Sequence, residues 1–162
     1  MFKEQTMINI RRAIREDFEN LEDLYRELEE DGVLYQPQHF VLSPKGARSE
    51  YMEGILGSDN QALFVAEDDG RVIGFAHVVL IKSKPFSCLK PELAMYLQDL
   101  VVTAEYRSRG IGSMFMETVK EYGRENGADF FRTQVFPGNT DGLRFYKRNG
   151  FTETMITIEA PL

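Results

Sequence analysis

The sequence predicts a single α/β (α+β) domain in which strands and helices alternate along the chain. Its 162 residues are enough for one domain with a core of its own. With 43% hydrophobic and 28% charged residues, the composition is that of an ordinary globular protein. No internal repeat, low-complexity tract or flexible linker divides the chain. We therefore expect one domain over residues 1–162, with residues 1–6 readable as a leader or as an alternative start ahead of Met7.

The first part of the chain predicts a strand followed by two helices. Residues 8–10 alternate between apolar and polar side chains, which is typical of a short strand. Apolar residues then recur at helical spacing over residues 18–32, a run that ends at a glycine. Ser43 and Pro44 resemble a helix N-cap and a first-turn proline, and the helical pattern after them ends at Gly57.

The middle of the chain predicts an antiparallel hairpin and a further strand. Two β-rich runs, residues 62–67 and 72–81, flank a tight turn at Asp69 and Gly70. Residues 82–91, which contain two prolines, connect this hairpin to the next strand.

The strand over residues 93–102 carries an irregular pattern. Apolar side chains alternate as far as Leu97, but residues 100–102 are all apolar. The strict period of two therefore fails at Gln98 and Asp99, and we expect a β-bulge there.

The last third of the chain predicts two helices alternating with two strands. They are expected as a helix over 111–127, a strand over 130–136, a short helix over 143–150 and a final strand over 154–160.

Composition excludes several classes of function. A net charge of -7 argues against a general nucleic-acid binder, which needs a basic face for phosphates, and favours a cationic small molecule. No apolar run is long enough to span a membrane, and the N-terminus lacks the pattern of a secretory signal. The single Cys88 excludes a disulfide framework, and it lies too far from His39 and His77 to predict a metal site. We expect a free thiol in the reducing cytoplasm.

The turn between the strand at 93–102 and the helix at 111–127 is typical of an anion site. It consists of Arg107, Ser108, Arg109, Gly110, Ile111, Gly112 and Ser113. Glycines allow close approach of the backbone, and the start of the helix contributes about half a positive charge. The turn lacks the Gly-Lys-Ser/Thr of a Walker A loop, and Phe115 stands where a dinucleotide fingerprint has its third glycine. Taken alone, it is also compatible with a tight turn that carries solvated arginines.

Two motifs together resemble the GNAT family of N-acetyltransferases. The segment LVVTAEYRSRGIGSMFM is similar to the family's first motif, with Arg107, Gly110 and Gly112 at its Arg-x-x-Gly-x-Gly positions. Asn139, followed by the Phe-Tyr-x-x-x-Gly-Phe pattern that begins at Phe145, is similar to the second motif. The resemblance implies a mixed, mostly antiparallel sheet of six to seven strands flanked by about four helices.

This resemblance also implies the reaction: an acyltransferase that moves the acetyl group of acetyl-CoA to the primary amine of a small, cationic acceptor. The turn at residues 107–113 would hold the pyrophosphate, and Leu100, Val101 and Val102 would pair with the pantetheine arm like an added strand. A backbone N–H of that strand would stabilise the oxyanion. The family resemblance requires no metal, and it makes a homodimer an expectation by analogy.

Two side chains of the second motif receive roles from the same resemblance. Tyr146 matches the general acid that protonates the departing thiolate, although its spacing alone also fits a core aromatic. Asn139 matches either a cofactor contact or a plain helix N-cap.

The residue at the position of the general base differs from the family pattern that this sequence resembles most. Tyr-Leu-Gln-Asp at residues 96–99 is similar to the Tyr-Leu-Glu-Asp of the diamine (spermidine/spermine) acetyltransferases, but Gln98 replaces the acid and cannot accept a proton. Asp99 is the nearest replacement, with Glu105, Glu53 and His77 as more distant alternatives; His77 also fits a structural histidine in an apolar strand.

Two further hypotheses stay open. The first predicted helix carries an acidic run that is either a solvated face or an attraction for a polycationic acceptor. Its members are Glu19, Glu22, Asp23, Glu27, Glu29, Glu30 and Asp31. The loss of the acid at Gln98 also leaves room for an acyl-CoA sensor without turnover, and a protein or peptide amine remains an alternative acceptor.

Overall fold

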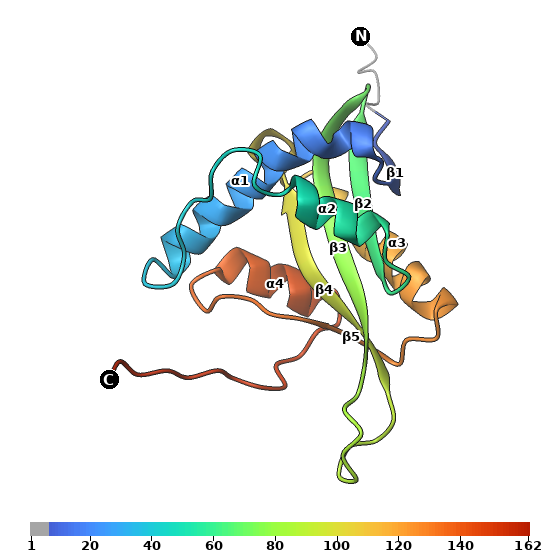
Figure 1. The fold of residues 1–162 in the computed structure, drawn as a ribbon, viewed down its shortest axis with the longest axis vertical. Helices are drawn as coiled ribbons and strands as arrows, with labels where there is room; N and C mark the ends of the chain where they lie inside the picture. Colours follow the sequence, from blue (N-terminus) through green and yellow to red (C-terminus); the bar gives the residue numbers. More distant parts are fainter. Residues whose placement is uncertain (1–6) are drawn as a thin grey trace.

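The computed structural model describes residues 7–162 as a five-stranded sheet flanked by four α-helices, the fold class that the sequence predicts (Figure 1). The strands lie in the order of the chain: β1 (Asn9–Arg12), β2 (Gln61–Asp68), β3 (Arg71–Lys82), β4 (Leu93–Val102) and β5 (Phe130–Thr133). The helices are α1 (Phe18–Tyr35), α2 (Ser49–Leu56), α3 (Ile111–Glu125) and α4 (Thr140–Arg148). Only β4 and β5 pair in parallel, so the sheet is mixed and mostly antiparallel, as expected.

Each face of the sheet has its own core. Helices α1 and α2 cover one face, where Tyr25 and Met52 pack against Phe75 and Val101. Helix α3 covers the other face, where Phe115 packs in a second cluster. Figure 1 shows α4 beside β4, near the part of β4 that the short strand β5 does not pair with. No helix of residues 7–162 is long and apolar enough to cross a membrane.

The hairpin between β2 and β3 confirms the predicted turn. Asp69 and Gly70 have φ angles of 48° and 82°. Positive φ at both central residues defines the turn whose twist matches that of the flanking strands, and glycine adopts it without strain.

The predicted bulge in β4 is also confirmed, and it decides which side chains face which helices. His77 pairs with Asp99 and the next residue, Val78, pairs with Leu97, so Gln98 is left without a partner on β3. Leu97 therefore packs on the α3 face, whereas Asp99 lies across from His77. In a regular strand, Leu97 and Asp99 would lie on the same face of the sheet, because side chains alternate between the two faces.

Several element boundaries differ from the prediction, and for two of them the structure shows the physical cause. Helix α2 begins at Ser49 and not at Ser43, because the backbone and hydroxyl of Ser43 donate to the carboxylate of Glu29 on α1 instead of capping a helix. Strand β5 ends at Thr133, three residues before the predicted end at Phe136, whose ring packs against the loop after α1.

The predicted final strand over residues 154–160 is wrong for this single chain. Residues 152–162 form no helix or strand and are exposed throughout. The described residues therefore contain five strands and not the expected six to seven.

Candidate active site

The predicted anion turn joins β4 to α3 with its backbone amides free. A short 3-10 turn (Ala104–Tyr106) follows β4, and Gly110 then begins α3 with φ 80°, an angle that favours glycine. Ser108 also has a positive φ of 62°. Within the described residues, no backbone N–H from Ser108 to Ser113 donates a hydrogen bond, and that of Met114 is the first to do so, to Gly110. The turn and the first turn of α3 can therefore donate several N–H groups to one anion.

Gly112 has a packing reason of its own. A Cβ at this position would lie 3.0 Å from the ring of Phe145 on α4. The second glycine of the motif thus lets α4 approach the start of α3, which places the two predicted motifs side by side.

Two arginines lie at the turn and are exposed. Arg107 Nε donates to the carbonyl oxygen of Val102 at 2.9 Å. The guanidinium of Arg109 lies 4.9 Å from the ring centroid of Tyr106, whose hydroxyl donates to Asp68 at 2.5 Å. Both positive charges are thereby held beside the free amides.

The edge of β4 opens just before this turn. β5 pairs with β4 only from Ala94 to Leu97. The N–H of Thr103 donates to Ile73 on β3, and backbone groups point alternately to the two edges of a strand. Leu100 and Val102 therefore direct their N–H and C=O groups away from β3, toward the side that β5 leaves open. Val101 directs its backbone toward β3 and buries its side chain in the core.

Asp99 lies beside the opening and close to His77. The Asp99 carboxylate is 15% exposed, with Oδ2 3.8 Å from Nδ1 of the fully buried His77. Nε2 of His77 lies 2.8 Å from the side-chain oxygen of Gln61, which can only accept, so Nε2 carries the hydrogen. Nδ1 then faces Asp99 and the hydroxyl of Tyr51, at 3.4 Å from the latter. The two potential bases thus share one site.

Three tyrosines from three elements feel the charge of this carboxylate. Burial raises the pKa values of Tyr25 (α1), Tyr51 (α2) and Tyr96 (β4), and the negative charge of Asp99 raises each further. Among the described residues, the Tyr25 hydroxyl is the buried side-chain polar group without a hydrogen-bond partner. A buried hydroxyl without a partner can take a hydrogen bond with a bound polar ligand. These tyrosines were not predicted as part of the site; the register of the bulge could have placed Tyr96 on the Asp99 face, whereas Tyr25 and Tyr51 come from helices.

Tyr146 lies where β4 and β5 separate. Its ring packs against Phe151, and the side chain is half-buried. Burial raises the pKa of Tyr146 to about 12; the nearby hydroxyl of Thr133 lowers it in part, and the charges of Asp99 and Tyr96 raise it. Thr133 itself donates to the Leu97 carbonyl, which fixes the end of β5 at this point. The charge of Asp99, the predicted base, therefore affects the pKa of Tyr146, the predicted acid, across the open edge.

The other candidates have structural partners. The Asn139 side chain accepts from the N–H of Gly142 at 3.0 Å, so Asn139 is the N-cap of α4. Glu105 pairs with Arg71, and Glu53 pairs with Arg15, both on the surface. Neither glutamate has a contact that would connect it to Asp99.

Part of the acidic run on α1 holds neighbouring elements. Glu22 accepts from the backbone of Arg48, Glu27 from Thr103, and Glu29 from Ser43. Burial raises the pKa of Asp31, and the charge of Arg107 lowers it in part. The C-terminal half of α1 therefore places carboxylates next to the end of β4.

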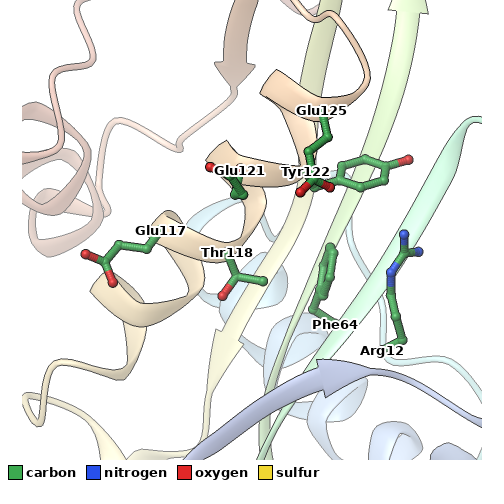
Figure 2. Close-up of a pocket in the computed structure, with 7 residues that line it drawn as sticks. All are labelled: Arg12, Phe64, Glu117, Thr118, Glu121, Tyr122 and Glu125. Atoms are coloured by element: carbon green, nitrogen blue, oxygen red, sulfur yellow. The ribbon is translucent and has the colours of Figure 1, made fainter.

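A separate pocket lies between α3 and the β1 edge of the sheet (Figure 2). It has a volume of about 470 Å³. Its floor consists of Phe64 and Tyr122, with the guanidinium of Arg12 4.8 and 5.0 Å from the two ring centroids. The pocket shares no residue with the turn, the open edge or the Asp99 cluster, so it is not part of the candidate active site.

Comparison with known proteins agrees with this arrangement. The family model described as "Acetyltransferase (GNAT) family" matches residues 16–151. An uncharacterized N-acetyltransferase of Bacillus subtilis is 25% identical over 146 residues, which cover 90% of this chain and 91% of the relative.

Solved structures show the same fold. A mutant of a Bacillus halodurans protein superimposes with a TM-score of 0.90 at 21% identity, covering 95% of this chain and 99% of that chain. The aminoglycoside N-acetyltransferase AAC(6')-Iy, in complex with the bisubstrate analogue CoA-S-monomethyl-acetylneamine, gives a TM-score of 0.74 at 25% identity and covers 96% of this chain and 98% of that chain. The chain therefore belongs to the acetyltransferase (GNAT) family and is an acyltransferase of the N-acetyltransferase type.

Proposed function

We propose that this N-acetyltransferase transfers the acetyl group of acetyl-CoA to a primary amine of a small, cationic acceptor by direct attack in a ternary complex. The observation that carries the proposal is the position of Asp99. The bulge at Gln98 places this carboxylate across from His77, whose Nδ1 also faces Tyr51, and immediately before the backbone of Leu100 that faces the open edge. A base and a site for the thioester thus adjoin on one strand.

The residues at the turn and at the β4 edge fit acetyl-CoA. The free N–H groups from Ser108 to Ser113 suit a pyrophosphate, with Arg107 and Arg109 as neighbouring charges. Leu100 and Val102 direct backbone groups to the open edge, where they can pair with the amides of a pantetheine arm as a sheet edge does with an added strand; the Val102 carbonyl at present accepts from Arg107. When bound, the thioester supplies the activated acetyl group.

Side chains of this chain then handle the protons. An alkylammonium must lose a proton before it attacks, because at neutral pH only about one amine in a thousand is uncharged. Asp99 accepts that proton, and His77 Nδ1 lies close enough to share it. The amine nitrogen forms the new bond to the acetyl carbon as the carbon–sulfur bond breaks. The N–H of Leu100 stabilises the carbonyl oxygen, and Tyr146 donates its proton to the leaving sulfur.

The surroundings of Asp99 favour a cationic acceptor. The Asp99 carboxylate offers a negative charge to an ammonium group, next to rings of Tyr25 and Tyr51 over which the guanidinium of Arg48 already lies at 4.8 and 5.7 Å from the centroids. Carboxylates on the C-terminal half of α1 add negative charge near the end of β4. The solved aminoglycoside acetyltransferase supports acceptors that carry several amines. Polyamines and aminoglycosides are therefore the classes that we expect to react.

The direct test is release of CoA thiol from acetyl-CoA against a panel of polyamines, aminoglycosides, amino acids and basic peptides. The exposed Cys88 requires a blank without acetyl-CoA. We expect release that depends on a polyamine or an aminoglycoside. Release with peptides only, or no release while acetyl-CoA still binds, would contradict the proposed acceptor class.

Two further expectations are part of this proposal. A single exposed cysteine and no other thiol suits the reducing cytoplasm. We also propose a homodimer, because the described chain leaves apolar surface uncovered on its C-terminal segment.

A further inference from the structure

His77 is a fully buried histidine next to the proposed base. It lies on β3 and is 1% exposed, among the apolar residues of the sheet. A neutral imidazole donates a hydrogen from one ring nitrogen and accepts one at the other, and buried polar atoms need partners for both. The nitrogen that carries the hydrogen therefore decides what His77 offers to Asp99.

Gln61 holds this hydrogen on the ring nitrogen that does not face Asp99. It is the first residue of β2 and lies diagonally across from His77, because His77 pairs with Leu63 two residues further on. The side-chain oxygen of Gln61 lies 2.8 Å from Nε2, the distance of a full hydrogen bond. Nε2 is thereby fixed as the donor, and Nδ1 is left as an acceptor.

On the other side of the ring, Nδ1 and Asp99 face each other without a hydrogen between them. Nδ1 lies 3.8 Å from Oδ2 of Asp99, which is too long for a hydrogen bond. Two acceptors cannot bond to each other, so this separation fits an unprotonated Nδ1 opposite an ionised carboxylate. The hydroxyl of Tyr51, 3.4 Å from Nδ1, can donate to the same lone pair. The arrangement is complete except for one proton between Asp99 and Nδ1.

We propose that Gln61 is a positioning residue for acetyl transfer: by holding the hydrogen of His77 on Nε2, it keeps the Nδ1 lone pair free to accept from protonated Asp99. The inference rests on the proposed role of Asp99 as the base. When the ammonium group of the acceptor gives its proton to the carboxylate, the new O–H of Asp99 donates to Nδ1, and the uncharged amine attacks the thioester. This hydrogen bond stabilises the state in which Asp99 holds the proton.

Without Gln61, the same histidine would work against the reaction. With no acceptor at Nε2, the hydrogen is favoured on Nδ1, where it can donate to the ionised carboxylate of Asp99. That bond stabilises the carboxylate before proton transfer instead of the acid after it. Asp99 then accepts a proton from the ammonium group less readily, although its own position on β4 is unchanged.

The first test locates the hydrogen on the ring by nitrogen NMR of protein labelled at histidine. The chain contains two histidines, and the second, His39, lies on the surface, so the spectrum is simple. We expect His77 of the wild type to carry its hydrogen on Nε2 at neutral pH, and Gln61→Leu to move it to Nδ1. Gln38→Leu is the matched control, because Gln38 is exposed in the loop after α1, and it should leave the His77 signals unchanged.

The second test asks whether Gln61 acts through His77. With the best amine of the panel, Gln61→Leu should lower kcat about tenfold, the worth of one hydrogen bond, and leave KM for acetyl-CoA within about twofold. The double variant Gln61→Leu/His77→Leu should be no slower than His77→Leu, because the effect of Gln61 requires the imidazole. Thermal melting checks that each variant folds.

Each measurement has a result that would overturn the inference. A wild-type His77 with its hydrogen on Nδ1, or an unchanged tautomer in Gln61→Leu, would do so whether or not the enzyme turns over. A shifted tautomer with unchanged kcat would also do so, since the ring would then not assist the base. Absence of amine-dependent CoA release in the wild type would instead overturn the proposed function, and the inference with it, so the two failures are distinguishable.

Discussion

Replacing Asp99 by asparagine removes the proposed base with almost no change in volume. General base catalysis is worth about 10² to 10⁴ in rate. His77 Nδ1, 3.8 Å from the carboxylate, remains in the variant as a substitute acceptor, which places the expected loss at the lower end of that range. We therefore expect kcat/KM for the amine to fall about a hundredfold at neutral pH, or about 2.7 kcal/mol in transition-state stabilisation.

The pH dependence of this loss identifies its cause. Below the pKa of the amine, the uncharged fraction rises about tenfold per pH unit, and the variant depends on that fraction. The ratio of wild-type to variant kcat/KM should therefore shrink as the pH rises from neutral toward that pKa. KM for acetyl-CoA should stay within about twofold, because Asp99 lies opposite His77 and outside the turn at residues 107–113 that would bind the pyrophosphate.

The assay is continuous detection of thiol release with the best amine of the panel. Glu105→Gln and Glu53→Gln are matched controls, since each removes a carboxylate from a surface ion pair away from the cluster. An Asp99→Asn variant within threefold of the wild type, or a ratio that does not change with pH, would refute Asp99 as the base.

Three further predictions follow from the packing and the charges. Gly112→Val should destabilise the protein by about 1 to 3 kcal/mol in urea unfolding, because its Cβ would lie 3.0 Å from the ring of Phe145; a variant as stable as the wild type would contradict the close approach. Arg11→Gln should cost about 3 kcal/mol, since it leaves the 5%-exposed Asp17 without its ion pair. Burial raises the pKa of Asp17, but hydrogen bonds from Arg11 and the backbone outweigh this effect and lower the pKa overall. The stability that this pair contributes is therefore present above the unfolded pKa of 3.8 and is lost as the pH falls through the folded pKa. Acid titrations of the wild type and of Arg11→Gln by circular dichroism should therefore converge at low pH. Because the pKa of Tyr146 is raised to about 12, the pH profile of kcat should show no falling limb up to pH about 10, where an ordinary phenol would begin to ionise; a decline below pH 9 would contradict its assignment as the acid.

The features that the sequence predicted correctly are turns and irregularities that depend on residues adjacent in the chain. The Asp69 and Gly70 turn has a signature that fits only one hairpin geometry, and the structure confirms it. The bulge at Gln98 was predictable because a buried strand cannot change its apolar phase without an extra residue. The glycine turn before α3 was predictable because Gly110 has a positive φ, a conformation that favours glycine.

Features that depend on distant partners were not predictable. Ser43 has the sequence of a helix cap, but a carboxylate on α1 takes its hydrogen bonds. The aromatic surroundings of Asp99 come from α1, α2 and β4, and only the three-dimensional register brings them together. The final strand was predicted from alternation alone, and residues 152–162 form no helix or strand in the structure.

The most direct test of the central claim is amine-dependent release of CoA by the wild type and by Tyr146→Phe, with acetyl-CoA affinity measured by calorimetry in parallel. Tyr122→Phe, which removes a phenol from the separate pocket beside α3, is the matched control. We predict turnover in the wild type and in the control, a loss of about 10² to 10⁴ in kcat for Tyr146→Phe, and unchanged acetyl-CoA affinity in all three. Binding of acetyl-CoA without amine-dependent release in the wild type would contradict catalysis and indicate a sensor. Full activity of Tyr146→Phe would show that the proton for the thiolate comes from another group.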